Sequence, residues 1–185
     1  MQPLTVVTVM TDARLRYAPA LRASCRRLYG CDPVILGLGK PWIGRSSSKI
    51  ILLRVALRQL RGLVLYVDGY DTLLLRGPGA VRDALAACSR PFLMAAETLA
   101  WPSWFPGLPS LRYIATPYRC LNAGCFVAEA GYAAKVFRRL PSLADSDQVA
   151  LAELWVRDPS VFVIDHAGGL CHCLNGASAD LARDS

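Results

Sequence analysis

The sequence has 185 residues, of which 54% are hydrophobic, and a formal net charge of +7. This composition excludes a disordered chain, and the length predicts a single domain over residues 1–185 with a sizeable core. No apolar run approaches the roughly 20 residues that a membrane-spanning helix needs, so we expect no membrane insertion. The N-terminal residues lack the basic start of a signal peptide, which makes the cytoplasm the default expected location.

The positive charge is carried mostly by arginines that are scattered along helix-like segments. There is no long basic block interleaved with aromatic residues, so solvated helix faces explain the charge best. A basic nucleic-acid-binding α/β protein stays open as an alternative. The seven cysteines fit no common zinc-site spacing, and we expect ordinary thiols.

In chain order, strands and helices alternate over the first half of the sequence. The pattern predicts strands over 4–10, 33–38 and 63–67, with helices over 16–28 and 48–61 between them. This βαβαβ order predicts a parallel sheet that is covered by helices on both faces. For the second half the predicted elements are a helix over 79–88, strands over 92–96 and within 122–130, helices over 131–140 and 146–156, and a strand over 161–165.

A long segment rich in proline and tryptophan, LAWPSWFPGLPS, follows the strand over 92–96. A connection of this length inside a compact domain is more often a lid or a binding element than a plain linker. We therefore expect it to cover a ligand site and exclude water.

Two carboxylates, Asp68 and Asp71, directly follow the most apolar predicted strand. In parallel sheets, ligands bind beyond the carboxyl ends of the strands. Two carboxylates at this spacing can share Mg²⁺ or Mn²⁺ and leave positions open for phosphate oxygens. Taken alone, however, D-x-x-D is more typical of an acidic turn or a helix cap.

His166 ends the last predicted strand, directly after Asp165. If that strand lies beside the strand over 63–67, His166 shares an edge with the two aspartates. One imidazole with two carboxylates suits Mn²⁺ better than Mg²⁺.

Several further residues have both a structural and a functional explanation. Lys49 begins a helix, where its charge and the backbone amides can meet a phosphate. Trp42 and Tyr70 are either core residues or stacking surfaces for a base or a sugar. Asp145 and Asp147 either cap a helix or face the ligand.

Seven motifs occur in a fixed order along the chain: GLGKPWIG, SSSKIILLRVAL, LVLYVDGYDTLLL, MAAETLAWP, LNAGCFVAEAGY, DSDQ and IDHAGGLCHCLNG. From about Thr5 to Gly176 the chain resembles the glycosyltransferase domain of the procollagen lysyl hydroxylase (PLOD)/LH3-like family. The resemblance implies a GT-A-like, Rossmann-like α/β/α fold with a mostly parallel sheet, a UDP-sugar donor and Mn²⁺.

The resemblance also implies roles for individual residues. The positions that match the family's metal ligands are Asp68, Asp71 and His166. The positions that match its nucleotide contacts are Thr8, Trp42, Lys49 and Tyr70, with Asn175 as a further contact. The positions that match its acceptor-side or catalytic residues are Trp101, Asn122, Asp145 and Asp147.

The chain departs from the family pattern at two places near these residues. Asn122-Ala123-Gly124-Cys125 stands where the family usually has Asn-Ser-Gly-Gly, and the acidic run before the DQ pair is thinned to Asp145-Ser146-Asp147. The chain shows no iron- and oxoglutarate-binding hydroxylase domain, so lysyl hydroxylation is not expected of it.

The resulting hypothesis is a metal-dependent glycosyltransferase that moves glucose or galactose from a UDP-sugar to an acceptor hydroxyl. A hydroxylysine-like group is one candidate acceptor, and the sequence predicts neither the acceptor nor the oligomeric state. A catalytically silent nucleotide-sugar-binding module of the same fold stays open as a second alternative.

Overall fold

The computed structural model describes residues 2–42, 47–100 and 115–172. The elements in chain order are β1 (Leu4–Val9), α1 (Ala18–Tyr29), β2 (Val34–Leu36), α2 (Ser47–Leu57), β3 (Leu63–Val67), α3 (Pro78–Ala86), β4 (Phe92–Glu97), β5 (Cys120–Glu129), α4 (Ala130–Arg138), α5 (Asp147–Arg157) and β6 (Val163–Ile164). Every predicted element is present, although the last strand has only two residues where five were predicted.

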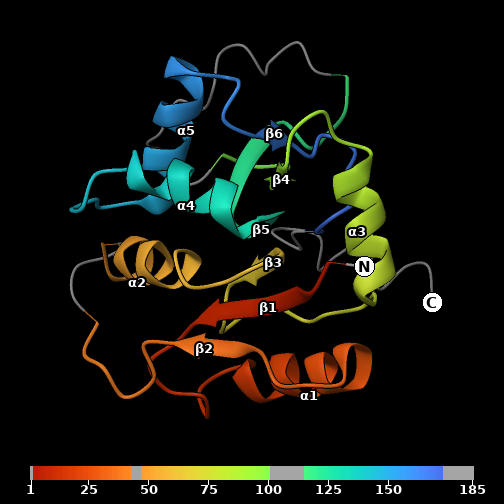
Figure 1. Ribbon diagram of the computed structural model, residues 1–185, viewed down its shortest axis with the longest axis vertical. Helices are drawn as coiled ribbons and strands as arrows, with labels where there is room; N and C mark the ends of the chain where they lie inside the picture. Colours follow the sequence, from red (N-terminus) through yellow and green to blue (C-terminus); the bar gives the residue numbers. More distant parts are fainter. Residues whose placement is uncertain (1, 43–46, 101–114, 173–185) are drawn as a thin grey trace.

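The strands form one sheet with the order β2-β1-β3-β5-β4-β6 (Figure 1). β1 pairs in parallel with β2 and β3, as the βαβαβ pattern predicted, and β6 pairs in parallel with β4. β5 is antiparallel to both of its neighbours. Glu97 pairs with Cys120, so the chain leaves β4 and enters β5 at the same edge, which requires an antiparallel pair.

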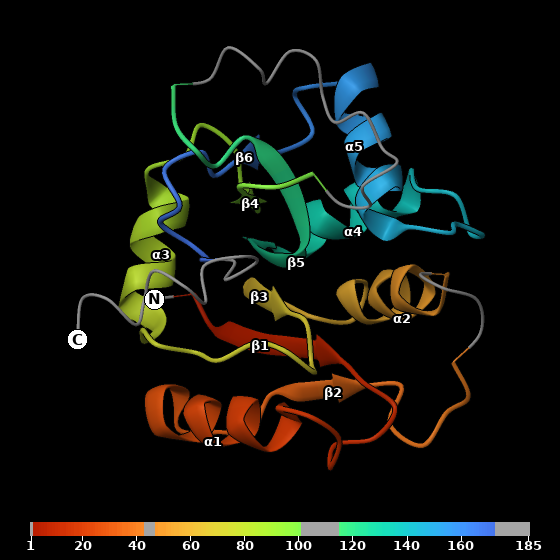
Figure 2. The same cartoon turned by 180° about the vertical axis from the view of Figure 1, so that it is seen from behind.

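Helices cover both faces of the sheet and make three layers, which confirms the predicted α/β/α architecture (Figures 1 and 2). Side chains of α2, α4 and α5 share one hydrophobic cluster, whereas those of α1 and α3 share another. β3 serves both layers, because Val64 and Tyr66 belong to the first cluster and Leu65 and Val67 to the second. Its uninterrupted apolar sequence follows from this double coverage.

Helix ends are set by familiar local chemistry. α1 carries a proline in its first turn and ends at Gly30, which is left-handed with φ of 74°. α5 begins after Ser146, whose side chain accepts a hydrogen bond from the N–H of Val149 at 3.3 Å. In the described part of the chain, no helix has the length and apolarity required to cross a bilayer.

Several arginines are bound to the protein's own polar groups. Arg54 donates from Nη2 to the carbonyl of Leu140 at 2.8 Å and from Nε to that of Phe137 at 3.2 Å, which holds the end of α4. Arg139 pairs with Asp158 at 2.7 Å. These contacts fit the structural interpretation of the basic residues, while nucleic-acid binding stays an untested alternative.

Candidate active site

The polar side chains gather at the edge of the sheet where β1, β3, β4 and β6 end and β5 begins, called the carboxyl edge below. Asp68 directly follows β3, and its N–H donates to the carbonyl of Gly124 in β5 at 2.8 Å. Asn122 is the third residue of β5, and Glu97 is the last residue of β4. The sheet therefore brings together residues that are far apart in the sequence.

Lys49, in the first turn of α2, is the centre of this cluster. Its Nζ lies 2.8 Å from Asp68 Oδ1 and 2.6 Å from Asp147 Oδ2, and only 12% of its side chain is exposed. Burial alone would lower the pKa of Lys49, but the charge of Asp68 and the neighbouring Tyr66 and Asp147 outweigh burial and hold the pKa well above its usual range. Lys49 is thus a fixed cation between two carboxylates.

Tyr66, in β3, contacts both Asp68 and Lys49. Its hydroxyl donates to Asp68 Oδ1 at 2.6 Å, and the Lys49 ammonium lies 5.1 Å from the centre of its ring. Burial and the negative charge of Asp68 raise the pKa of Tyr66 well above its usual range, so the phenol keeps its proton. Sequence reasoning missed this residue, although residues two apart on a strand share a face and Tyr66 precedes Asp68 by two.

Glu97 organises a second polar group beside Asp68. This carboxylate is only 2% exposed, and it accepts hydrogen bonds from Gln148 Nε2 at 2.7 Å and Asn122 Nδ2 at 3.3 Å. Gln148 Oε1 in turn accepts the N–H of Ala123 at 3.1 Å. Sequence reasoning did not select Glu97. A charged residue at the end of an otherwise apolar strand is the sequence feature that could have identified it.

Gly124 allows the two groups to approach each other. A Cβ at this position would lie 2.9 Å from both Asp68 Oδ2 and Asn122 Oδ1. The departures from the family pattern on either side, Ala123 and Cys125, are both buried in the hydrophobic clusters. They therefore change core packing, while the glycine that touches the site is retained.

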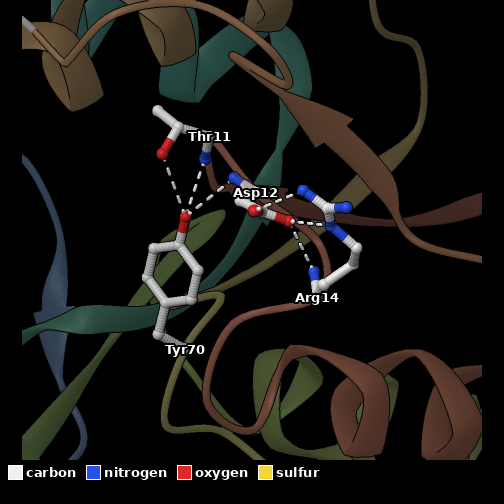
Figure 3. A network of polar contacts seen from close by, with 4 residues as sticks. All are labelled: Thr11, Asp12, Arg14 and Tyr70. Carbon is white, nitrogen blue, oxygen red and sulfur yellow. Dashed lines mark hydrogen bonds and ion pairs between the residues drawn. The ribbon is translucent and has the colours of Figure 1, made fainter.

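Tyr70, on the turn between the two aspartates, is fastened to the residues that follow β1 (Figure 3). Its hydroxyl accepts the N–H groups of Thr11 at 2.8 Å and Asp12 at 3.0 Å, and Asp12 is held by Arg14. Burial raises the pKa of Tyr70, but a hydrogen bond with the Thr11 hydroxyl at 3.1 Å and the two from the backbone outweigh it, and the net effect is a lowered pKa. The predicted nucleotide platform is thus held in one orientation.

The other predicted nucleotide and catalytic residues have different positions. Thr8 is fully buried. A Cβ on Gly69 would lie 2.9 Å from its Oγ1, so Thr8 packs against the turn that carries the two aspartates. Trp42 is 46% exposed. Asp145 is exposed and precedes the N-cap of α5, so of the two predicted aspartates it is Asp147 that joins Lys49. Two further predicted residues, Trp101 and Asn175, lie outside the described residues.

The predicted metal ligands are only partly brought together. Burial and the negative charge of Asp68 raise the pKa of Asp71, so these two carboxylates are close enough to repel each other. β6, which precedes His166, lies beside β4, with β5 and β4 separating it from β3, so the condition that it adjoins β3 is not met. In residues 2–42, 47–100 and 115–172, no three His, Cys, Asp or Glu side chains form a group that could hold a metal.

His166 is nevertheless oriented. Its Nδ1 lies 2.7 Å from the carbonyl of Tyr118, and its own carbonyl accepts the hydroxyl of Thr116 at 2.7 Å. A ring that donates from Nδ1 to a carbonyl keeps its lone pair on Nε2, which is the arrangement common among metal-ligating histidines.

The fold and the site define an α/β protein with a polar cluster of carboxylates, one lysine and amides at the carboxyl edge of its sheet. The family model of the PLOD GT domain matches residues 1–184, and the chain belongs to this family of glycosyltransferase domains. The family resemblance and the GT-A-like, Rossmann-type fold expected from the sequence are thereby confirmed.

A curated relative is similar over nearly the whole chain. It is the "Multifunctional procollagen lysine hydroxylase and glycosyltransferase LH3" of Rattus norvegicus, which is 25% identical over 192 residues. The alignment covers 94% of this chain and 25% of the rat protein, so the chain spans about a quarter of the length of that relative.

Proposed function

We propose that the chain transfers a hexose, glucose or galactose, from a UDP-sugar to an acceptor hydroxyl with the help of a divalent cation, Mn²⁺. The observation that carries the proposal is the partly buried cluster of Lys49, Asp68 and Asp147 at the carboxyl edge, in a chain of a glycosyltransferase family. A cation placed beside carboxylates at this edge is the arrangement that a diphosphate and its metal require.

The donor set fits a divalent cation in part. Asp68 and Asp71 repel each other, and a cation between them would relieve the repulsion that raises the pKa of Asp71. The orientation of His166 supports it as a third ligand, although it is not grouped with the aspartates in this structure. Bound there, the cation would neutralise charge on the leaving diphosphate.

The reaction breaks the bond between the sugar's anomeric carbon and the β-phosphate oxygen, and UDP leaves with the electron pair. The acceptor oxygen forms the new bond to that carbon, and its proton passes to a carboxylate at this edge, for which Asp145 and Asp147 are the proposed candidates. Lys49 stabilises the departing negative charge, because its ammonium is fixed before the reaction begins.

On the donor side, Tyr70 and Trp42 position the nucleotide. Tyr70 is suited to this role because Thr11 and Asp12, which follow β1, bind its hydroxyl and hold the ring in place. Asn122, oriented by Glu97, would contact the sugar or the acceptor.

The test is thermal unfolding with UDP, with and without Mn²⁺, on the wild type and on the Asp68→Asn/Asp71→Asn double variant. Asp83→Asn is the matched control, because Asp83 is exposed on α3. A ligand at 100 times its Kd should raise the midpoint by about 5 °C in the wild type and the control only. A wild type without a metal-dependent shift, or an equal shift in the double variant, contradicts the proposal.

A second candidate, the catalytically silent binding module, is favoured by the thinned acidic run, since one of its two aspartates is already paired with Lys49. Release of UDP from UDP-glucose or UDP-galactose separates the two. The enzyme releases UDP faster when an acceptor alcohol is added, whereas the silent module shows the midpoint shift without turnover.

A further inference from the structure

The C-terminal end of α1 carries two cysteines near each other. Cys25 lies on the helix and is fully buried, whereas Cys31 is exposed and follows the capping residue Gly30. Cys31 is among the groups that raise the pKa of Cys25, after burial.

The backbone at the cap accounts for the nearness of the two residues. Gly30 has φ of 74°, and its N–H donates to the carbonyl of Arg26 at 3.0 Å. In a left-handed cap of this kind, the residue after the glycine commonly packs back onto a residue in the last turn but one of the helix. Here those two positions are Cys31 and Cys25, so the cap itself brings the thiols together.

A charge clamp holds the same segment in place. The carboxylate of Asp32 binds Arg26 Nε at 2.8 Å and Arg22 Nη2 at 3.2 Å. Both arginines are on α1, so the residue after Cys31 is pulled back over the helix from which Cys25 projects. The two cysteines are therefore held close by the cap on one side and by the clamp on the other.

We propose that Cys25 and Cys31 form an intramolecular disulfide, with a low-molecular-weight disulfide such as oxidised glutathione as the oxidant. The thiolate of Cys31 attacks one glutathione sulfur, forms a mixed disulfide and releases one glutathione thiolate. The Cys25 thiolate then attacks Sγ of Cys31, forms the protein disulfide and releases the second glutathione thiolate. Two thiol protons pass to solvent or to the glutathione thiolates, so the protein loses two hydrogens.

The order of the two steps follows from the surroundings of each thiol. Cys31 is exposed and can meet the oxidant. Burial, with the nearby Cys31 and Asp32 adding to it, raises the pKa of Cys25 to about 11, so Cys25 is a poor first nucleophile. Cys25 reacts second because the mixed disulfide is formed next to it.

The disulfide would brace a helix that supports the candidate active site. Ser24, the neighbour of Cys25, accepts the N–H of Leu74 at 3.1 Å, and the N–H of Tyr17 donates to the carbonyl of Tyr70 at 3.3 Å. Both bonds fasten the segment that carries Asp71 to α1. A tie at the end of α1 thus stabilises the helix to which this segment is anchored.

The test compares the reduced chain with the chain treated with oxidised glutathione under native conditions. Trypsin cleaves after Arg26 and Arg27, which lie between the two cysteines, so the flanking peptides stay joined only through the disulfide. We expect the intact mass to fall by about 2 Da and the joined peptides to appear. We also expect the unfolding midpoint to rise by about 5 °C on oxidation.

Cys31→Ser is the informative variant, because an exposed cysteine is replaced and folding is preserved, and it should lose the midpoint rise. Cys88→Ser, at a half-buried site beyond α3, is the control and should keep it. Persistence of glutathione on Cys31 with Cys25 still a thiol overturns the proposal. An equal midpoint rise in Cys31→Ser does so as well.

Discussion

Two of the places where basic side chains meet aspartates, one at the carboxyl edge and one on the surface, differ in burial. At the carboxyl edge, Lys49 is 12% exposed and is shared between Asp68 and Asp147. On the surface, Arg139 pairs with Asp158 at 2.7 Å, but both side chains remain in contact with water, at 46% and 33% exposure. A short distance is common to both clusters. In the first, Lys49 and Asp147 are largely withheld from solvent, at 12% and 15% side-chain exposure, while Asp68 keeps 39%.

The difference teaches where an ion pair matters. An exposed ion pair adds little to the free energy of unfolding, because water solvates each charge almost as well as the partner does. A buried charge that loses its partner is neither paired nor solvated, which destabilises the fold strongly. The buried cluster should therefore dominate both stability and ligand binding, and variants in the two clusters can test this contrast.

Lys49→Met should have the largest effect, because it leaves Asp68 and Asp147 facing each other without a cation. We expect a loss of about 2–3 kcal/mol in the free energy of unfolding, because Asp147 is buried while Asp68 is partly solvated. The loss is measured by urea denaturation, and the UDP-dependent shift should be lost as well. Lys135→Met, at an exposed position of α4, is the matched control and should change little. Equal losses in the two variants would remove the distinction between the clusters.

Gly124→Ala should come second. The added Cβ would lie 2.9 Å from both Asp68 and Asn122, so one of these groups must move. We expect a loss of about 1–3 kcal/mol and weaker UDP binding by calorimetry. Gly79→Ala, in α3 where a Cβ meets nothing within 4 Å, is the control and should not lose stability; it should gain about 0.5 kcal/mol. A fully stable Gly124→Ala that binds UDP normally would show that the close approach is unimportant.

Asp71→Asn should act in the opposite direction on the ligand-free protein. Asp71 is an exposed residue, and the desolvation of its carboxylate together with the charge of Asp68 raises its pKa, so its charge is slightly unfavourable in the fold at neutral pH and its removal relieves repulsion. We expect a rise of about 1–2 °C in the midpoint together with a weaker Mn²⁺-dependent shift. A lower midpoint without ligand would mean that Asp71 already has a stabilising partner.

Arg139→Gln should have the smallest effect. Both members of its pair are solvated, so the unfolding midpoint should stay within about 1 °C of the wild type. Differential scanning fluorimetry at low and high salt is sufficient to measure it. A drop as large as that of Lys49→Met would contradict the comparison on which these predictions rest.

Much of the fold could be predicted from periodicity, since the βαβαβ half of the chain has strands and helices of the expected kind in the expected order. The antiparallel direction of β5 could not, because its sequence is apolar like that of a parallel strand and only the edge at which the connection from β4 returns decides it. β6 was too short for its pattern to give its neighbour in the sheet.

The site was predictable to the extent that charged residues followed strands. Asp68 was selected in this way and Lys49 as a cation at the start of a helix, and the two are in contact. Tyr66 and Glu97 were missed, because an aromatic or a single charge inside an apolar run is ordinarily a core or edge residue, and their roles depend on partners from other elements. Thr8 was selected through the family resemblance, whereas its full burial follows from the packing of Gly69 above it.

The pairing of Glu97 with Cys120 has a further consequence. Because β4 and β5 close on each other beside the site, the connection between them, residues 98–119, begins and ends at the carboxyl edge. Insertions or deletions within it would leave the strand order of the sheet unaltered. An engineered graft at this connection would therefore leave the scaffold intact.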